Sequence, residues 1–143
     1  MTALEFLQQA YMLDQQIQTK LQQISSLRSL AESMRSFTAK EPVCHTKHVT
    51  ALEDAVIRIM EEEQELNAEI DRLVDLKREI REVISEVRDL NLRLVLEKRH
   101  LCFESWLQIG REMGRTDRWA QMKHRMALVV VQGILDRRTE PAC

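Results

Sequence analysis

The sequence has few of the residues that interrupt helices. Its 143 residues include only three glycines and two prolines, too few for a protein built from many short strands and tight turns. Leucine, glutamine, glutamate, arginine and methionine, which favour helices, are plentiful instead. The composition therefore argues against a turn-rich β protein and predicts an all-α fold of one or two small units.

Aromatic residues are scarce as well, at 4%, whereas charged residues make up 31% of the chain. This balance favours an aliphatic core between elongated helices. No apolar run approaches the roughly 20 residues that cross a membrane, and residues 1–10 lack the basic start of a signal peptide. The cysteines, Cys44, Cys102 and Cys143, are odd in number and irregularly spaced, which argues against a disulfide framework. We therefore expect a cytoplasmic protein with no membrane partner.

Charge is unevenly distributed along the chain. Residues 1–87 contain 10 basic and 16 acidic residues, a net charge of −6, whereas residues 88–143 contain 11 and 7, a net charge of +4. An acidic arm followed by a basic end is the pattern expected of a DNA-binding module carried on an oligomerisation arm.

A long apolar series begins at Leu52 and advances by alternating steps of four and three residues, interrupted only by Glu63 and Lys77. This spacing, close to 3.5 residues, predicts a left-handed coiled coil in a helix over about residues 49–88. Further apolar residues widen the stripe, so a single partner helix would not cover it. We expect oligomerisation through Leu52, Val56, Ile59, Leu66, Ile70, Leu73, Ile80 and Ile84.

Residues 4–34 carry a second series with the same spacing and supply a partner for that helix. Pro42 lies between the two series and ends any helix. The economical interpretation is a long antiparallel helical hairpin over residues 1–88, with a linker near residues 38–50. Surplus apolar width on both helices would let two hairpins pair into a four-helix bundle, giving a dimeric or higher homo-oligomer.

Residues 89–143 form a second predicted unit, which contains a helix-turn-helix pattern after a short break at 89–91. Ser105 is placed to cap a helix, and Gly114 suits the left-handed residue that closes it. Thr116 then caps a second helix, whose buried face is expected to include Ala120, His124, Ala127, Leu128 and Val131. The small core of this unit is expected to contain Leu96, Trp106, Ile109, Ala120 and Leu128.

The opposite face of the second helix carries side chains suited to DNA. Two helices joined by a glycine-containing turn are the arrangement that places a recognition helix in the major groove. Arg118, Gln121 and Arg125 would then read base edges, while Arg115 and Thr116 would lie near phosphates. The predicted face for double-stranded DNA consists of Arg115, Thr116, Arg118, Gln121, Met122 and Arg125.

Three stretches resemble a known family of regulators. Residues 99–128, RHLCFESWLQIGREMGRTDRWAQMKHRMAL, resemble the helix-turn-helix of σ-factor region 4. Together with LDQQIQTKLQQISSLRSLA (13–31) and EIDRLVDLKREI (69–80), they resemble phage-encoded transcriptional regulators of the ArpU and RinA type, which carry this module behind a coiled coil. The resemblance implies an all-α fold, regulation of phage late genes, DNA as a partner and residence in the bacterial host cytoplasm.

Two other functions compete with DNA binding. In the first, Met122 and Met126 join the apolar run at residues 129–131 to form a surface that docks on RNA polymerase or another regulator. In the second, the chain is a purely structural coiled coil. The second alternative leaves the turn at Gly114–Thr116 unexplained, because such a protein has no need of a capped helix-turn-helix.

Motifs for other chemistry are weak. Cys44, His45 and His48 have suitable ligand types for zinc, but their spacing matches no closed four-ligand set. His124 is interpreted as a hydrogen-bonded core histidine, and the acidic run at residues 61–65 as a solvated helix face. We recognise neither a phosphate-binding loop nor a nucleophile–base arrangement in the sequence. We therefore expect no metal, no cofactor and no enzymatic activity.

Overall fold

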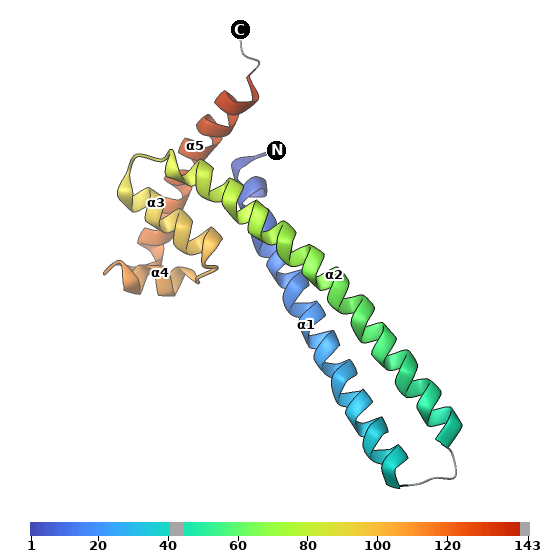
Figure 1. Cartoon of the computed structure of the whole chain (residues 1–143). Coiled ribbons are helices and arrows are strands. Elements are labelled where there is room, and N and C mark those ends of the chain that lie inside the picture. Colours follow the sequence, from blue (N-terminus) through green and yellow to red (C-terminus); the bar gives the residue numbers. More distant parts are fainter. Residues whose placement is uncertain (41–44, 141–143) are drawn as a thin grey trace. The chain divides into compact units, whose positions relative to one another are not determined.

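The computed structural model describes residues 1–40 and 45–140, and of residues 37–40 and 45–49 it describes the backbone alone. The described residues contain helices and no strand, which confirms the predicted all-α class (Figure 1). In chain order the elements are α1 (Ala3–Lys40), α2 (His45–Ser85), α3 (Leu90–Leu96), the π-helical segment η2 (Glu97–Leu101), α4 (Trp106–Glu112) and α5 (Asp117–Thr139). None of these helices is long and apolar enough to cross a membrane.

The helix boundaries differ from the predicted ones at two places. Helix α1 continues to Lys40 and α2 begins at His45, so the predicted linker over residues 38–50 is too long; Pro42 lies outside the described residues. The second break covers residues 86–89 rather than residues 89–91. Asp89 is the N-cap of α3, and its side chain accepts hydrogen bonds from the backbone of the first helical turn.

The chain divides into two compact units, and their boundaries differ from the domains expected on either side of residue 88. One unit contains residues 14–72, which include α1 from residue 14 onward and α2 up to residue 72. The other unit combines residues 1–13 with the chain from residue 73 onward. The N-terminal part of α1 and the C-terminal part of α2 therefore belong to the same packed unit as α3, α4 and α5.

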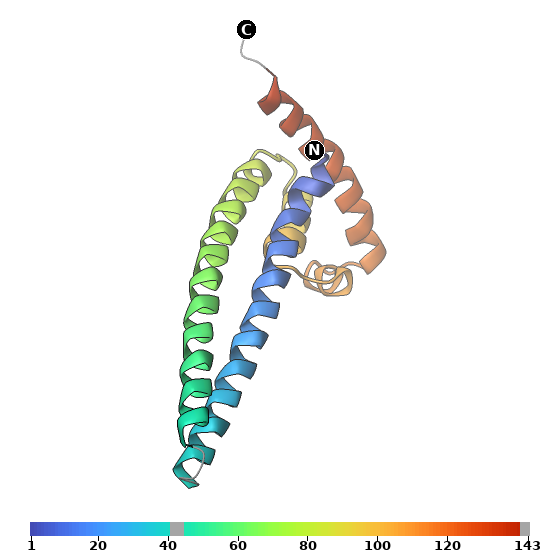
Figure 2. The same cartoon turned by 90° about the vertical axis from the view of Figure 1, so that its right-hand side faces the viewer.

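In the unit of residues 14–72, the segments of α1 and α2 run antiparallel and side by side (Figures 1 and 2). Apolar side chains line the contact between them, and those that are buried are Ile17, Ile24, Ala31, Ile59 and Leu66. Lys20 lies among three carboxylates of α2, with its Nζ atom 2.5 Å from Glu65 Oε2, and Arg28 pairs with Glu63. The acidic run is therefore not simply a solvated face as predicted, because it pairs with basic residues of α1.

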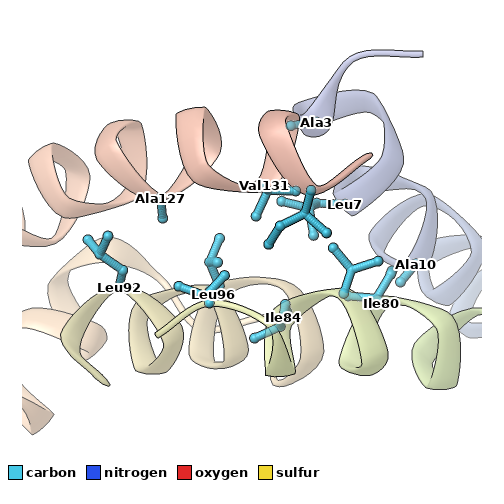
Figure 3. Close-up of a cluster of buried hydrophobic side chains, with 12 residues drawn as sticks. Ala3, Leu7, Ala10, Ile80, Ile84, Leu92, Leu96, Ala127 and Val131 are labelled. Atoms are coloured by element: carbon cyan, nitrogen blue, oxygen red, sulfur yellow. The ribbon is translucent and has the colours of Figure 1, made fainter. Parts of the chain in front are cut away.

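The other unit has an aliphatic core built from segments that are distant in sequence. Figure 3 shows Leu7 of α1, Ile84 of α2, Leu96 of α3 and Val131 of α5 pointing toward one another. The full set of buried residues in this cluster is Ala3, Leu7, Ala10, Ile80, Val83, Ile84, Val87, Leu92, Leu96, Ala127, Val131 and Ile134. This core holds the C-terminal half of α5 and leaves its N-terminal half to pack with α4.

Candidate nucleic-acid interface

Helices α4 and α5 begin at the capping residues that the sequence predicts. The Oγ atom of Ser105 accepts a hydrogen bond from the backbone N of Gln108 at 3.2 Å. The Oγ1 atom of Thr116 accepts one from the backbone N of Trp119 at 3.1 Å. Between the helices, Gly114 has a φ of 67°, in the left-handed region that glycine adopts without a steric penalty. The predicted caps at Ser105 and Thr116 and the left-handed conformation of Gly114 are therefore confirmed.

The turn brings the backbone of α4 unusually close to the start of α5. The carbonyl oxygen of Gly110 accepts a hydrogen bond from the backbone N of Arg115 at 2.7 Å. A Cβ atom added to Gly110 would lie 2.7 Å from the carbonyl carbon and oxygen of Thr116 and 2.9 Å from the backbone N of Asp117. The two helices can therefore approach this closely only because residue 110 is a glycine.

A small core joins the inner faces of α4 and α5. Val95, Ile109 and Ala120 are fully buried there, and the partly buried side chains packed around them are Trp106, Met113 and Trp119. Leu96 and Leu128, which the sequence assigned to this core, belong instead to the larger cluster built with α1 and α2. This cluster includes Leu7 of α1 and Ile84 of α2, which lie outside residues 89–143, so the local pattern did not separate the two clusters.

Two buried histidines lie beside this core. The Nε2 atoms of His100, in η2, and His124, in α5, are 2.8 Å apart, so one ring donates a hydrogen bond and the other accepts it. Trp106 packs edge-on against His124, with 4.8 Å between the ring centroids. The interpretation of His124 as a hydrogen-bonded core histidine is confirmed, whereas its partner His100 was not foreseen.

Burial keeps both imidazoles neutral at physiological pH. Loss of hydration lowers the pKa of His100 to about 3, with a further contribution from a charged His124 and from Arg99. The pKa of His124 falls to about 4, again through burial first and Arg99 second. Because a second proton would leave both Nε2 atoms as donors, protonation of both rings would break the hydrogen bond between them.

Arginines lie over two tryptophan rings of the site. The guanidinium carbon of Arg99 is 4.3 Å from the ring centroid of Trp106, and its Nη1 atom donates to the carbonyl oxygen of Glu104 at 2.9 Å. The guanidinium carbon of Arg115 is 5.7 Å from the ring of Trp119. Arg99 is therefore tied into the fold, whereas the exposed Arg115 makes a looser contact.

Five of the six predicted DNA-binding residues are exposed, and Gln121 is half-buried. Arg118, Met122 and Arg125 lie on the outer side of α5 at spacings of three and four residues, which places them on adjacent turns. In the described part of the chain, no carboxylate pairs with Arg118 or Arg125. The hydroxyl of Thr116 is already occupied as an acceptor by its capping hydrogen bond.

A second group of basic side chains, which was not predicted from the sequence, lies beside the start of α3. Arg88, Arg137 and Arg138 line an open pocket beside the start of α3, where Glu86 and Asp89 also lie. The Nη2 atom of Arg138 is 3.0 Å from Glu86 Oε1, so part of this positive charge is neutralised. The excess of basic residues after residue 88 was the only signal for this group, because the packing of α5 on α2 and α3 brings it together.

The predicted oligomerisation residues fall into two groups. Ile59, Leu66, Ile80 and Ile84 are buried within the chain itself. Leu52 and Leu73 are half-buried, whereas Val56 and Ile70 are exposed by 36% and 38%. Of the predicted oligomerisation residues, Val56 and Ile70 are therefore the ones exposed enough to contact another molecule.

The candidate zinc ligands cannot be placed together. Cys44 and the side chains of His45 and His48 lie outside the described residues. Among the residues that are described, no three His, Cys, Asp or Glu side chains are grouped so that they could hold a metal ion. Cys102 is exposed and forms no disulfide.

Comparisons with known proteins add no identification. Searches against protein-family models, curated proteins and solved structures find no match to this chain.

Proposed function

We propose that the chain is a DNA-binding transcriptional regulator in which a hairpin of α1 and α2 carries the helix-turn-helix of α4 and α5. The observation that supports this most is the pairing of a tightly closed, doubly capped turn with an outer α5 face that presents unpaired arginines. A glycine-containing turn followed by a helix whose outer face carries arginines is the arrangement that places a recognition helix in the major groove.

In this proposal the outer residues of α5 divide the work of recognition. Arg118 and Gln121 contact base edges in the major groove, because guanidinium and amide groups make the paired hydrogen bonds that distinguish bases. Arg115, at the turn, contacts phosphate. Arg125 lies about two turns beyond Arg118 and contacts either a base or the backbone. Met122, between the arginines, contributes apolar contact to a thymine methyl group.

The arm would hold two or more such modules together. Val56 and Ile70 leave apolar surface on α2 that one hairpin does not cover, and this surface supports pairing of hairpins into a homo-oligomer. With the sequence resemblance, this arrangement supports a phage-type regulator, of late genes by analogy, acting in the cytoplasm of a bacterial host. We propose a binding function rather than an enzymatic one.

A second candidate function is docking on RNA polymerase or another regulator. Its support is the exposure of Met122 and Met126, at 49% and 48%, and of Val129, at 74%. Val131 was assigned to this apolar surface from sequence and does not belong to it, since it is fully buried in the core. In this version DNA contacts are weak and sequence-independent.

Selection from a randomised duplex pool, followed by fluorescence anisotropy, tests the two candidates. The selected duplex and a scrambled duplex of the same composition are titrated at several salt concentrations. Base readout predicts about 10³-fold or greater preference for the selected duplex at physiological salt. Equal binding to both duplexes, seen only at low salt, would reject base readout in favour of protein docking.

A further inference from the structure

The outer face of α5 carries an apolar stripe that the described residues leave uncovered. Met122, Met126, Val129 and Val130 follow one another at helical spacing, with exposures of 49%, 48%, 74% and 38%. Gly133 continues the stripe one turn later, and a Cβ atom added there would meet nothing within 4 Å. The stripe therefore consists of projecting side chains followed by an open, shallow position.

We propose that this stripe pairs with the same stripe of a second copy of the chain, with the two α5 helices antiparallel. In a twofold pairing centred between Val129 and Val130, each Met126 lies opposite the partner's Gly133. The long, flexible thioether side chain then fills the space that glycine leaves open. Met126, which projects, and Gly133, which leaves space, thus lie at equal distances from the centre of the stripe, as a self-complementary interface requires.

Charge complementarity selects the antiparallel direction. Arg125 and Asp136 are both exposed and lie about three turns apart along the same side of the stripe. In the antiparallel pair each Arg125 falls within reach of the partner's Asp136, which gives two equivalent ion pairs and leaves base readout to Arg118 and Gln121. In a parallel pair Arg125 and the partner's Asp136 would lie on opposite flanks and about three turns apart along the axis, so neither ion pair could form. Asp136 Oδ1 already accepts a hydrogen bond from Gln132 Nε2 at 3.0 Å, which fixes the carboxylate beside the stripe.

The pairing would also set the spacing of the DNA-reading residues, and this consequence rests on the proposed function. Arg118 lies about eleven residues before the centre of the stripe, so at 1.5 Å per residue the two copies of Arg118 would be about 34 Å apart. Half-sites one helical turn apart on B-DNA are separated by roughly 34–36 Å. Arg118 and Arg125 lie on the same flank of the stripe, so both copies would face one side of the pair.

Chemical cross-linking tests the interface without DNA. In full-length chains whose three native cysteines are replaced by serine, Val129→Cys is compared with Leu107→Cys, a position on α4 that is also exposed, at 55%, but lies off the stripe. With a short bismaleimide, the pairing predicts at least about fivefold more covalent dimer for Val129→Cys, because the pair holds the two thiols at high effective concentration. Equal yields at the two positions would overturn the proposal.

Charge-reversal variants distinguish a specific pair from non-specific hydrophobic association. In an Ile70→Asp background, which removes association through α2, Arg125→Asp and Asp136→Arg should each raise the dissociation constant about tenfold in sedimentation velocity, and the double variant should restore it. Gly133→Leu, which has room in the single chain, should also weaken association. Failure of the double variant to restore association would reject the antiparallel register.

These measurements remain separate from the DNA test. Cross-linking and charge rescue without preference for any duplex would retain the dimer and reject the proposed function. Specific DNA binding by a chain that shows neither would reject the dimer alone. Pull-down of purified RNA polymerase that Val129→Asp abolishes, in a chain that does not self-associate, would assign the stripe to the polymerase instead.

Discussion

The Nε2 atoms of His100 and His124 lie 2.8 Å apart in the interior of the unit that contains α4 and α5. Burial lowers the pKa of both residues, to about 3 and about 4, from an unfolded value of 6.5. The folded chain therefore binds fewer protons than the unfolded chain below pH 6.5. Stability from this pair is fully present above pH 6.5 and decreases as the pH falls from 6.5 toward 4.

We predict that the free energy of unfolding decreases by about 1–3 kcal/mol between pH 7 and pH 5, as each buried histidine opposes protonation. Urea denaturation followed by circular dichroism at half-unit pH intervals measures this change. His100→Gln should flatten the profile, because it removes one titrating group while keeping an amide that can bond His124. A profile that is level from pH 7 to pH 5, or that rises, would contradict the prediction.

Gly110→Ala should destabilise the chain, because the new Cβ atom would lie 2.7 Å from backbone atoms of Thr116 that cannot move independently of the turn. We expect a loss of about 1–3 kcal/mol, typical of overpacking. Gly133→Ala is the matched control in the single chain, where its Cβ meets nothing within 4 Å, so both variants are melted at a concentration below the dissociation constant of the proposed α5 pair. In a helix this control should gain about 0.5–1 kcal/mol. Equal effects of the two substitutions on thermal unfolding would refute the steric explanation.

Loss of the α5 cap should have a measurable cost. Thr116→Ala removes the acceptor for the backbone N of Trp119, and we expect a loss of about 1 kcal/mol. Thr116→Ser keeps a hydroxyl and should retain most of the stability. Melting curves of the full chain are the appropriate measurement, because residues 1–13 and 73–88 contribute to the same core. Indistinguishable curves for the alanine and serine variants would show that the cap contributes nothing.

The sequence predicted features that depend on neighbouring residues better than contacts between residues distant in the chain. Ser105, Gly114 and Thr116 were assigned correctly because caps and left-handed residues act within one turn of their own position. Leu96 and Leu128 were placed in the wrong core because their surroundings include Leu7 and Ile84, which no local periodicity connects to them. The apolar pattern predicted burial without identifying the partner.

The same limit applies to the arm and to the site. The heptad series in α2 predicted a buried stripe, but not that Leu66 would face its own chain while Ile70 stays exposed. The acidic run was interpreted as solvated because its partners, Lys20 and Arg28, lie on the other helix of the pair. Similarly, His124 was expected to be bonded, yet its partner His100 is separated from it by the whole of α4.

Two substitutions on α2 separate folding from association. Leu66 is 7% exposed, so Leu66→Asp must bury a carboxylate or part the helices, and we expect loss of helical structure in the unit of residues 14–72. Ile70 is 38% exposed, so Ile70→Asp should leave the helices of a single chain formed and weaken only association through α2. Circular dichroism and sedimentation equilibrium record the two effects. Unfolding by Ile70→Asp at micromolar concentration would mean that the chain folds only as an oligomer.

The outer face of α5 is tested by comparing residues with different proposed contacts. Arg118→Ala and Gln121→Ala should each lower affinity for the selected duplex by about 1–3 kcal/mol and hardly change binding to scrambled DNA. Arg115→Ala should weaken binding to both duplexes similarly and reduce the salt dependence, because a phosphate contact releases counterions and carries no sequence information. Arg111→Ala, an exposed arginine on α4 outside the proposed face, is the matched control.

The pattern across these variants decides between readout and general attraction, because all three arginine variants remove one positive charge. If loss of Arg118 lowers binding to the two duplexes equally, its charge matters and its position does not. The same conclusion would follow if Arg111→Ala had as large an effect as Arg118→Ala. Gln121 gives the cleanest result, since it carries no charge, and a loss of preference in Gln121→Ala arises from lost base contacts rather than from a weaker field.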